Sequence, residues 1–132
     1  MEPALPTKLS EIPQKNIPLK VRVAGRVSSY DVKSATMVLR DEDESVLIDI
    51  SLCLDPFKSY SWLRETNAPV MVVGYLERVP VSRKTRTKGQ LLDSTKDIIL
   101  RALLVREAND LQFSLWYQAI EERQRLNPAS EH

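Results

Sequence analysis

The sequence contains few of the residues on which most catalytic and metal sites depend. Its 132 residues include a single cysteine, Cys53, and a single histidine, His132, which is the last residue. One cysteine excludes an intramolecular disulfide framework and a zinc cluster built on cysteines. A lone histidine at the end of the chain argues against a catalytic or metal site built around histidine. We therefore expect no enzyme activity, no catalytic residue, no metal site and no cofactor.

Long apolar runs and a basic leader are also missing. No apolar run approaches the ~18 residues that span a bilayer. The first residues, MEPALPTKLSEIPQ, carry acids and prolines where a signal peptide has basic and then apolar residues. We therefore expect an intracellular, reducing location. With 42% hydrophobic and 28% charged residues, the composition is that of one globular domain, and the net charge of +1 indicates no particular partner.

Glycine is scarce, and its placement indicates a closed β-barrel. Lys20–Asp31 alternates apolar and polar residues as a half-buried strand does, and Gly25 lies inside it. A glycine inside a strand marks a bulge, a bend or a close backbone approach. Val70–Val79 is a second such strand, interrupted by Gly74. A barrel in which these two strands pair and bend would use glycines in this way.

The remaining elements follow the order of an OB-fold, a five-stranded Greek-key barrel with a helix between its third and fourth strands. We predict strands at 35–40, 46–51 and 98–105, the last of them buried because its apolar run is nearly continuous. The acidic turn at 41–44 is expected to be solvated, and Asp49 to lie on the surface. Asp55 as N-cap and Pro56 at the first helical position predict a helix over Asp55–Glu65.

The N-terminal segment holds four of the eight prolines within residues 1–18. Two alternatives remain open for it: a short helical turn at Leu9–Ile12 that plugs one end of the barrel, or a loosely held tail. The predicted organisation is a proline-rich lead-in at 1–18, a barrel at 19–108, a helix at 109–127 and a tail at 128–132.

The predicted C-terminal helix, Leu111–Asn127, is capped by Asn109 or Asp110 and has apolar residues on two sides. At ~100° per residue these residues form two stripes: Leu111, Leu115, Ala119 and Leu126, and Phe113, Trp116, Tyr117 and Ile120. A surface helix normally buries one stripe against its own domain, so the second stripe indicates a partner protein. The alternative is that the N-terminal segment covers it.

A basic loop lies between the fourth and fifth predicted strands, a position that borders the oligonucleotide face in OB-folds. It holds Arg83, Lys84, Arg86 and Lys88, which favours contact with backbone phosphates. A nuclear-localisation run, RKTRTK, and a merely solvated loop are the alternatives. Aromatic residues for base stacking are few. We therefore expect weak binding of single strands, with contributions from Tyr30, Tyr75, Arg22, Arg26 and Arg78.

The segments VAGRVSSYD, VMVVGYLE and LWYQAIEERQRL resemble the Ten1 family, the smallest subunits of the CST telomere-capping complex, over roughly residues 9 to 126. The family is similar in architecture to the smallest subunit of replication protein A. The resemblance implies a non-catalytic nuclear protein at telomeres that pairs with an OB-fold partner of the Stn1 type, beside a third, larger subunit. Their complex protects telomeric single-stranded DNA and supports its replication.

The resemblance also implies which side chains face the Stn1-type partner. The family's helix is matched by Leu115, Trp116, Ala119, Ile120 and Arg123, and we add Leu111 from the same stripe as Leu115. The alternative functions are a stand-alone single-strand-binding module and a small subunit like that of replication protein A.

Overall fold

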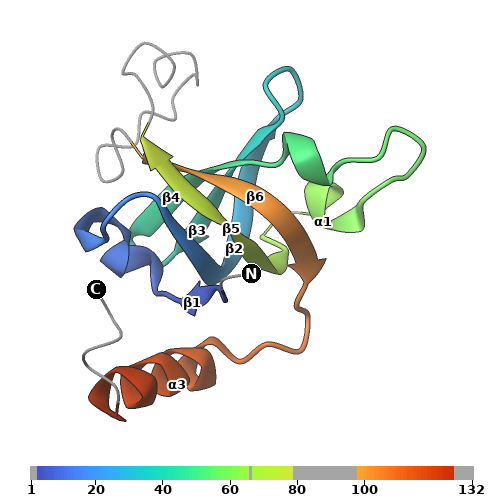
Figure 1. The fold of residues 1–132 in the computed structure, drawn as a ribbon. Helices are drawn as coiled ribbons and strands as arrows, with labels where there is room; N and C mark the ends of the chain where they lie inside the picture. The colour runs from blue at the N-terminus through green and yellow to red at the C-terminus, as the bar shows by residue number, and fades with distance from the viewer. Residues whose placement is uncertain (1–2, 66, 79–97, 127–132) are drawn as a thin grey trace.

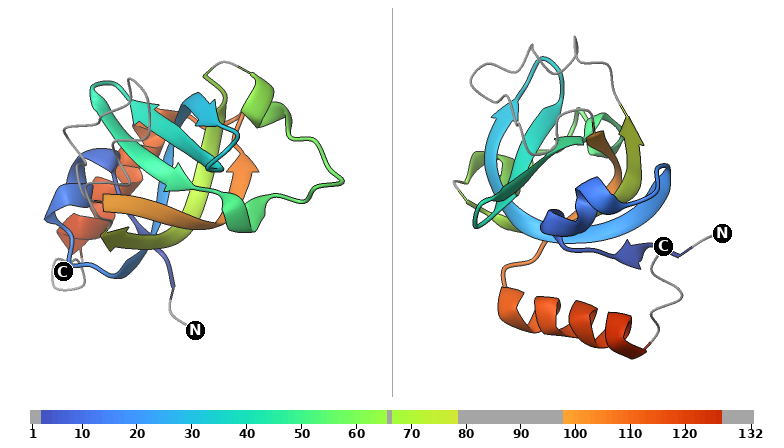
Figure 2. Two further views of the ribbon diagram at one scale, coloured as in Figure 1. Left: turned by 90° about the horizontal axis from the view of Figure 1, so that it is seen from above. Right: turned by 90° about the vertical axis from the view of Figure 1, so that its left-hand side faces the viewer.

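The computed structural model describes residues 3–65, 67–78 and 98–126. Its central strand is β2 (Leu19–Asp31), which pairs antiparallel with β5 (Pro69–Arg78) in its first part and with β3 (Thr36–Asp41) in its second. β3 continues into β4 (Glu44–Asp49), and β6 (Ile98–Glu107) pairs with both β4 and β5. The sheet therefore closes into the predicted five-stranded barrel (Figures 1 and 2).

Gly74 lies where two backbones approach too closely for a side chain, and at Gly25 the Leu39 side chain occupies the space that a Cβ atom would need. A Cβ atom on Gly74 would lie 2.2 Å from the Arg101 carbonyl oxygen, and one on Gly25 would lie 2.7 Å from Leu39 Cγ. The predicted pairing of the two strands is confirmed, since Val21 pairs with Gly74 and Gly25 with Val70. The bulge in the β2–β3 ladder falls between Val27 and Ser29, beyond Gly25.

The barrel core comes from the alternation predicted for the strands. The inward residues of β2 and β4, and Ile50 directly after β4, are buried. They are Val21, Val23, Val27, Val46, Ile48 and Ile50. The acidic turn lies in the β3–β4 hairpin, and its tip residues Glu42 and Asp43 are exposed as predicted. No described helix is both long and apolar enough to cross a membrane.

The N-terminal segment closes one end of the barrel. A 3-10 helix, η1 (Leu9–Gln14), buries Leu9 and Ile12 in the core, so the predicted plug is confirmed. Ahead of it, β1 (Leu5–Pro6) runs parallel to β2. The buried Thr7 fixes this approach, because its N–H donates to the Arg22 carbonyl at 2.9 Å.

The predicted helix over Asp55–Glu65 is wrong in extent. The structure has a short 3-10 helix, η2 (Ser51–Cys53), then a loop, and finally a single helical turn, α1 (Ser61–Arg64). The Asp55 carboxylate accepts the Phe57 N–H at 2.9 Å, and the Asp55 carbonyl accepts the Lys58 N–H at 3.0 Å. Asp55 thus makes the contact expected of an N-cap residue, but the chain does not continue as a helix beyond this one turn.

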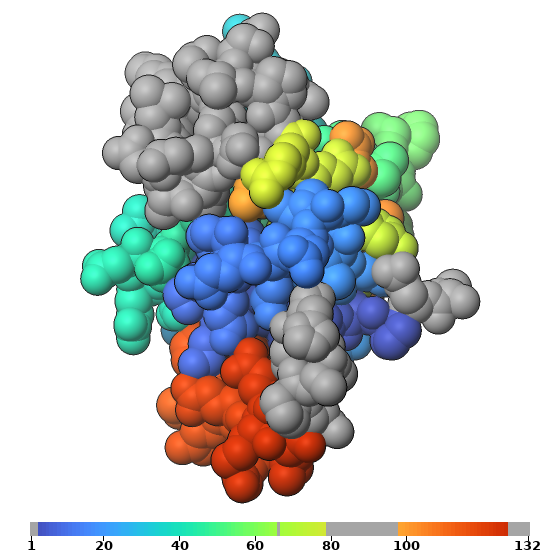
Figure 3. Space-filling model, turned by 60° about the vertical axis from the view of Figure 1, so that its left-hand side comes forward, coloured from blue at the N-terminus to red at the C-terminus, as the bar shows by residue number. Residues whose placement is uncertain are grey.

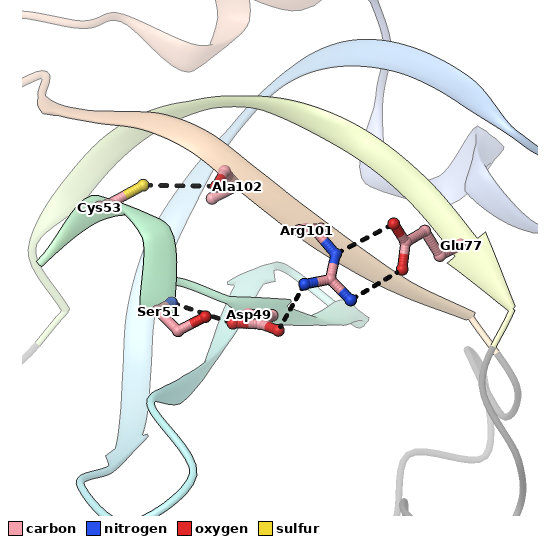
Figure 4. A network of polar contacts seen from close by, with 6 residues as sticks. All are labelled: Asp49, Ser51, Cys53, Glu77, Arg101 and Ala102. Carbon is pink, nitrogen blue, oxygen red and sulfur yellow. Dashed lines mark hydrogen bonds and ion pairs between the residues drawn. The ribbon is translucent and has the colours of Figure 1, made fainter.

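The surface position predicted for Asp49 is also wrong. Asp49 is 8% exposed, because β6 runs parallel beside β4 and Arg101 lies opposite it. Figure 4 shows its carboxylate accepting the Ser51 N–H at 2.9 Å and facing the Arg101 guanidinium at 3.7 Å. Arg101 also donates two hydrogen bonds to Glu77 on β5, at 3.0 and 3.1 Å.

The C-terminal helix α3 (Phe113–Leu126) lies outside the barrel, beneath the N-terminal segment (Figure 3). It begins later than predicted. Asn109 and Asp110 lie in a turn that is closed by the Leu111 N–H and the Ala108 carbonyl, so neither caps the helix. The Gln112 carbonyl instead accepts the N–H groups of Leu115 and Trp116.

Candidate partner-binding face and nucleic-acid surface

One face of α3, the inner face, packs against the chain's own N-terminal half. It comprises Phe113, Trp116, Tyr117 and Ile120, of which Ile120 is 1% exposed and the three aromatic residues are half-buried. The Arg26 guanidinium lies 5.1 Å from the centroid of the Phe113 ring, and the Lys8 ammonium lies 5.9 Å from that of Tyr117. A cation is attracted electrostatically to the face of an aromatic ring, so both contacts help to hold α3 against the N-terminal half of the chain.

Polar contacts with the N-terminal segment border this inner face. Lys8 pairs with Glu121 at 2.5 Å, and the Gln124 side-chain amide donates to the Glu11 carboxylate at 3.0 Å. Glu11 also accepts the Lys8 N–H at 3.1 Å. Since η1 plugs the barrel and also contacts α3, it connects the position of the helix to the core.

The inner face retains two polar atoms without partners. The Trp116 indole N–H and the Tyr117 hydroxyl are buried, and neither has a hydrogen-bond partner within the described part of the chain. Burial raises the pKa of Tyr117, and the neighbouring Asp41 and then Glu42 carboxylates raise it further. A buried polar group without a partner costs about 1–3 kcal/mol, which offsets part of the apolar gain of this packing.

The opposite face of α3, the outer face, is apolar and uncovered by described residues. It comprises Leu115, which is 55% exposed, Leu126, which is 65% exposed, and the exposed Ala119 between them. A shallow groove of about 600 Å³ follows it, bordered by Gln118, Glu121, Glu122 and Arg125. The two-stripe pattern in the sequence therefore corresponds to one covered and one uncovered face.

A second depression, the barrel groove, lies where β6 leads into α3. It measures about 460 Å³, and its apolar lining comes from Met71, Val73, Leu104 and Leu111. Arg22 and Arg106 line it as well, from β2 and β6. Leu111 lies in the segment just before α3, so the groove reaches the start of that helix.

The exposure of Leu104 corrects the prediction that 98–105 is buried throughout. Ile98, Ile99, Leu100 and Ala102 are buried, whereas Leu103 is 45% and Leu104 50% exposed. A register shift between Val73 and Gly74 in the pairing with β5 coincides with this change. Sequence reasoning therefore missed Met71, Val73 and Leu104 as surface residues. The period-two outward positions of β5 were the signal that could have identified the first two.

The residues predicted to face a partner separate into two groups. Leu115 and Ala119 lie on the outer face, and Leu111 lines the barrel groove. Ile120 lies on the inner face with the half-buried Trp116, and Arg123 is half-buried. Their contacts with another protein stay predictions.

The residues predicted to bind nucleic acid do not lie on one surface. Tyr30, near the end of β2, lines a small groove with Arg64. Tyr75 on β5 instead pairs with Lys20, which lies ten residues before Tyr30 on β2. The Lys20 ammonium lies 6.0 Å from the Tyr75 ring centroid. Arg26 is engaged by the Asn67 carbonyl at 3.2 Å, and Arg78 ends β5 with its side chain exposed. The basic residues Arg83, Lys84, Arg86 and Lys88 lie outside the described residues.

The described residues include no group of three or more candidate ligands that could hold a metal ion. Cys53 is half-buried, and its thiol lies 3.5 Å from the Ala102 carbonyl oxygen (Figure 4). Burial raises the pKa of Cys53, and the charge of Asp49 raises it further. The thiol is therefore protonated at neutral pH, which makes it a poor nucleophile.

Comparison with known proteins gives a family match over nearly the whole chain. A family model described as "Telomere-capping, CST complex subunit" matches residues 1–128. Among curated protein sequences, none matches significantly.

Three solved structures resemble this fold. A chain of the S. pombe Stn1–Ten1 complex has a TM-score of 0.66 and 22% identity over 94% of each chain. The Ten1 capping protein of the same yeast has a TM-score of 0.65 and 23% identity, covering 93% of this chain and 99% of that one. U. maydis replication protein A bound to single-stranded DNA has a TM-score of 0.59 and 18% identity over 100% of each chain. These likenesses confirm the predicted OB-fold.

Proposed function

The chain belongs to the Ten1 family of telomere-capping CST complex subunits, and we propose that it works there by binding a Stn1-type OB-fold partner through the outer face of α3. The observation that carries this proposal is the uncovered apolar row of Leu115, Ala119 and Leu126. Apolar side chains at helical spacing on one face of a helix are the anchors by which helices bind protein grooves. The solved complex of S. pombe Stn1 with Ten1 supports this choice of partner.

The size of the outer face indicates that the interface extends beyond α3. A helix of 14 residues is about 21 Å long, so one face about 10 Å wide offers roughly 200 Å². A stable interface buries about 800 Å² per partner. The barrel groove supplies further apolar surface beside Leu111. We therefore include Met71, Val73 and Leu104 in the proposed interface.

The proposed role is non-catalytic, in a nuclear complex at telomeric single-stranded DNA that also contains a third, larger subunit. The chain's own contacts to DNA are proposed at Arg26, Tyr30, Tyr75, Arg78 and the basic residues of the 80–89 loop. Arg26 already contacts Asn67 and Phe113 within the chain, so its contribution to DNA binding is expected to be small.

The experiment is co-expression of this chain with the Stn1-type subunit of the same organism, followed by size-exclusion chromatography with light scattering. A one-to-one complex supports the proposal. Two folded proteins that elute separately contradict it. The alternative function, a stand-alone single-strand-binding module, instead predicts salt-dependent oligonucleotide binding by the isolated chain with no effect of the partner.

A further inference from the structure

The loop between η2 and α1 presents one aromatic ring to solvent. Phe57 is 95% exposed, the largest exposed fraction among the described large hydrophobic side chains. No ring contact joins it to any described residue. The loop projects from the barrel away from α3 (Figure 1), so it is separate from the proposed partner-binding face.

This exposed ring stands on a braced backbone. The Asp55 carboxylate accepts the Phe57 N–H at 2.9 Å, and the Tyr60 hydroxyl accepts the Asp55 N–H at the same distance. Tyr60 in turn packs against the buried Trp62, with 5.5 Å between ring centroids. Because the core anchors the loop through this aromatic pair, Phe57 loses little backbone freedom when it binds a ligand.

The surroundings of Phe57 favour single-stranded nucleic acid over a protein as its ligand. Lys58 follows it directly, and Arg64 ends α1; both are exposed and lack ion pairs within the described residues. The apolar surface here is small, since the other exposed large apolar residue nearby in the chain is Leu52 of η2. Protein-binding patches commonly cover several hundred square ångströms, whereas a base needs one ring to stack on.

The position of the loop on the barrel supports the same ligand. Oligonucleotides bind OB-folds across the second and third strands and beside the loop between the first two, which here are β3, β4 and residues 32–35. The chain leaves β4 at Ile50, whose N–H donates to the Ala35 carbonyl at 2.9 Å. The Phe57 loop therefore begins next to that surface. Tyr30 lines one small groove together with Arg64 and Glu65.

We propose that Phe57 is a base-stacking residue for single-stranded nucleic acid, with Lys58 and Arg64 contacting the flanking phosphates. This role does not depend on how α3 binds a partner.

The test measures binding of a fluorescein-labelled oligo-dT of about 12 nucleotides, a length within the range of OB-fold sites, by anisotropy at low salt. The full chain is used alone and with its Stn1-type partner. Stacking contributes ~1–3 kcal/mol per base, so Phe57→Ala and Phe57→Leu should each weaken binding about 5- to 150-fold. Phe57→Trp should stay within about threefold of the wild type, because indole also stacks. Leu52→Ala is the matched control and should bind like the wild type.

The Phe57→Leu variant separates stacking from a general apolar contact. If it binds DNA as well as the wild type, stacking is refuted. A wild-type chain that binds no oligonucleotide, alone or in the complex, also overturns the proposal. Variants that lose the Stn1-type partner and keep DNA binding would instead assign Phe57 to a protein interface. Replacing Lys58 and Arg64 together by glutamine should flatten the dependence of log K on log salt by about 1.4, or ~0.7 per phosphate contact.

Discussion

Replacing Gly74 by alanine should destabilise the barrel severely, and far more than the same change at Gly25. At Gly74 the new Cβ would lie 2.2 Å from the Arg101 carbonyl oxygen and 2.8 Å from Ala102 Cα. Both obstacles are backbone atoms of β6, so that strand must shift by about 1 Å to restore normal contact distances. At Gly25 the nearest atom is Cγ of the Leu39 side chain, at 2.7 Å. A side chain can turn aside more cheaply than a paired strand can move.

Overpacking in a filled core typically costs about 1–3 kcal/mol and occasionally more. We place Gly25→Ala near 1–2 kcal/mol and Gly74→Ala at about 3 kcal/mol or above, out of a total stability of ~5–15 kcal/mol. Urea unfolding followed by circular dichroism measures both. With a slope of about 2 kcal/mol per molar, Gly74→Ala should lower the midpoint by about 1.5 M or more. A Gly74→Ala protein as stable as Gly25→Ala would refute the reasoning from backbone approach.

Two further predictions concern polar groups. The raised pKa of Tyr117 favours its neutral form in the folded chain, so the free energy of unfolding should fall as the pH rises above about 10. Tyr117→Phe should reduce this fall, because phenylalanine has no group that ionises in this pH range. Urea titrations from pH 8 to 11 compare the two proteins. Arg101→Leu should destabilise the chain by about 1–3 kcal/mol, because Asp49 would stay buried without its cation. If Asp49→Asn added to Arg101→Leu restores none of this loss, the ion pair is not its cause.

Much of the barrel could be predicted because its signals are local. The alternation of Val21, Val23 and Val27 specifies which side of β2 is buried, and it matches the structure. Gly25 and Gly74 indicated close contacts with neighbouring strands, and the short distances around both residues confirm them.

The features that sequence reasoning missed depend on distant neighbours or on competing local bonds. Asp49 lies opposite Arg101 because β4 and β6 pair in parallel. No local sequence pattern predicts this pairing. Asp55 makes the bond to the N–H two residues ahead that a helix N-cap makes, yet no helix follows the turn that it closes. The sequence patterns used for Asp49 and Asp55 take no account of the partners that each carboxylate finds in the folded chain.

For the candidate interface on α3, the apolar stripes could be predicted from the local sequence, whereas the stripe that is covered depends on residues distant in the chain. Helical periodicity gave two apolar stripes on α3, and the angle between them followed from the sequence alone. Which stripe packs against the barrel depends on the N-terminal segment, whose Lys8 and Glu11 contact Glu121 and Gln124. The residues predicted from the sequence to face a partner therefore included both Leu115 of the outer face and Ile120 of the inner face.

The most direct test of this account compares the affinity of the Stn1-type partner for the wild-type chain with that for Leu115→Asp, by calorimetric titration. Leu115 is exposed in the free chain, so the variant should fold with unchanged unfolding temperature. Burying a leucine contributes about 1.5–3 kcal/mol, and a desolvated carboxylate adds a penalty, so the affinity should fall about a hundredfold or more. Ser114→Asp, one residue earlier on the same helix, is the matched control and should bind within about threefold of the wild type. A Leu115→Asp protein that binds its partner with wild-type affinity would contradict the assignment of the outer face of α3 as the interface.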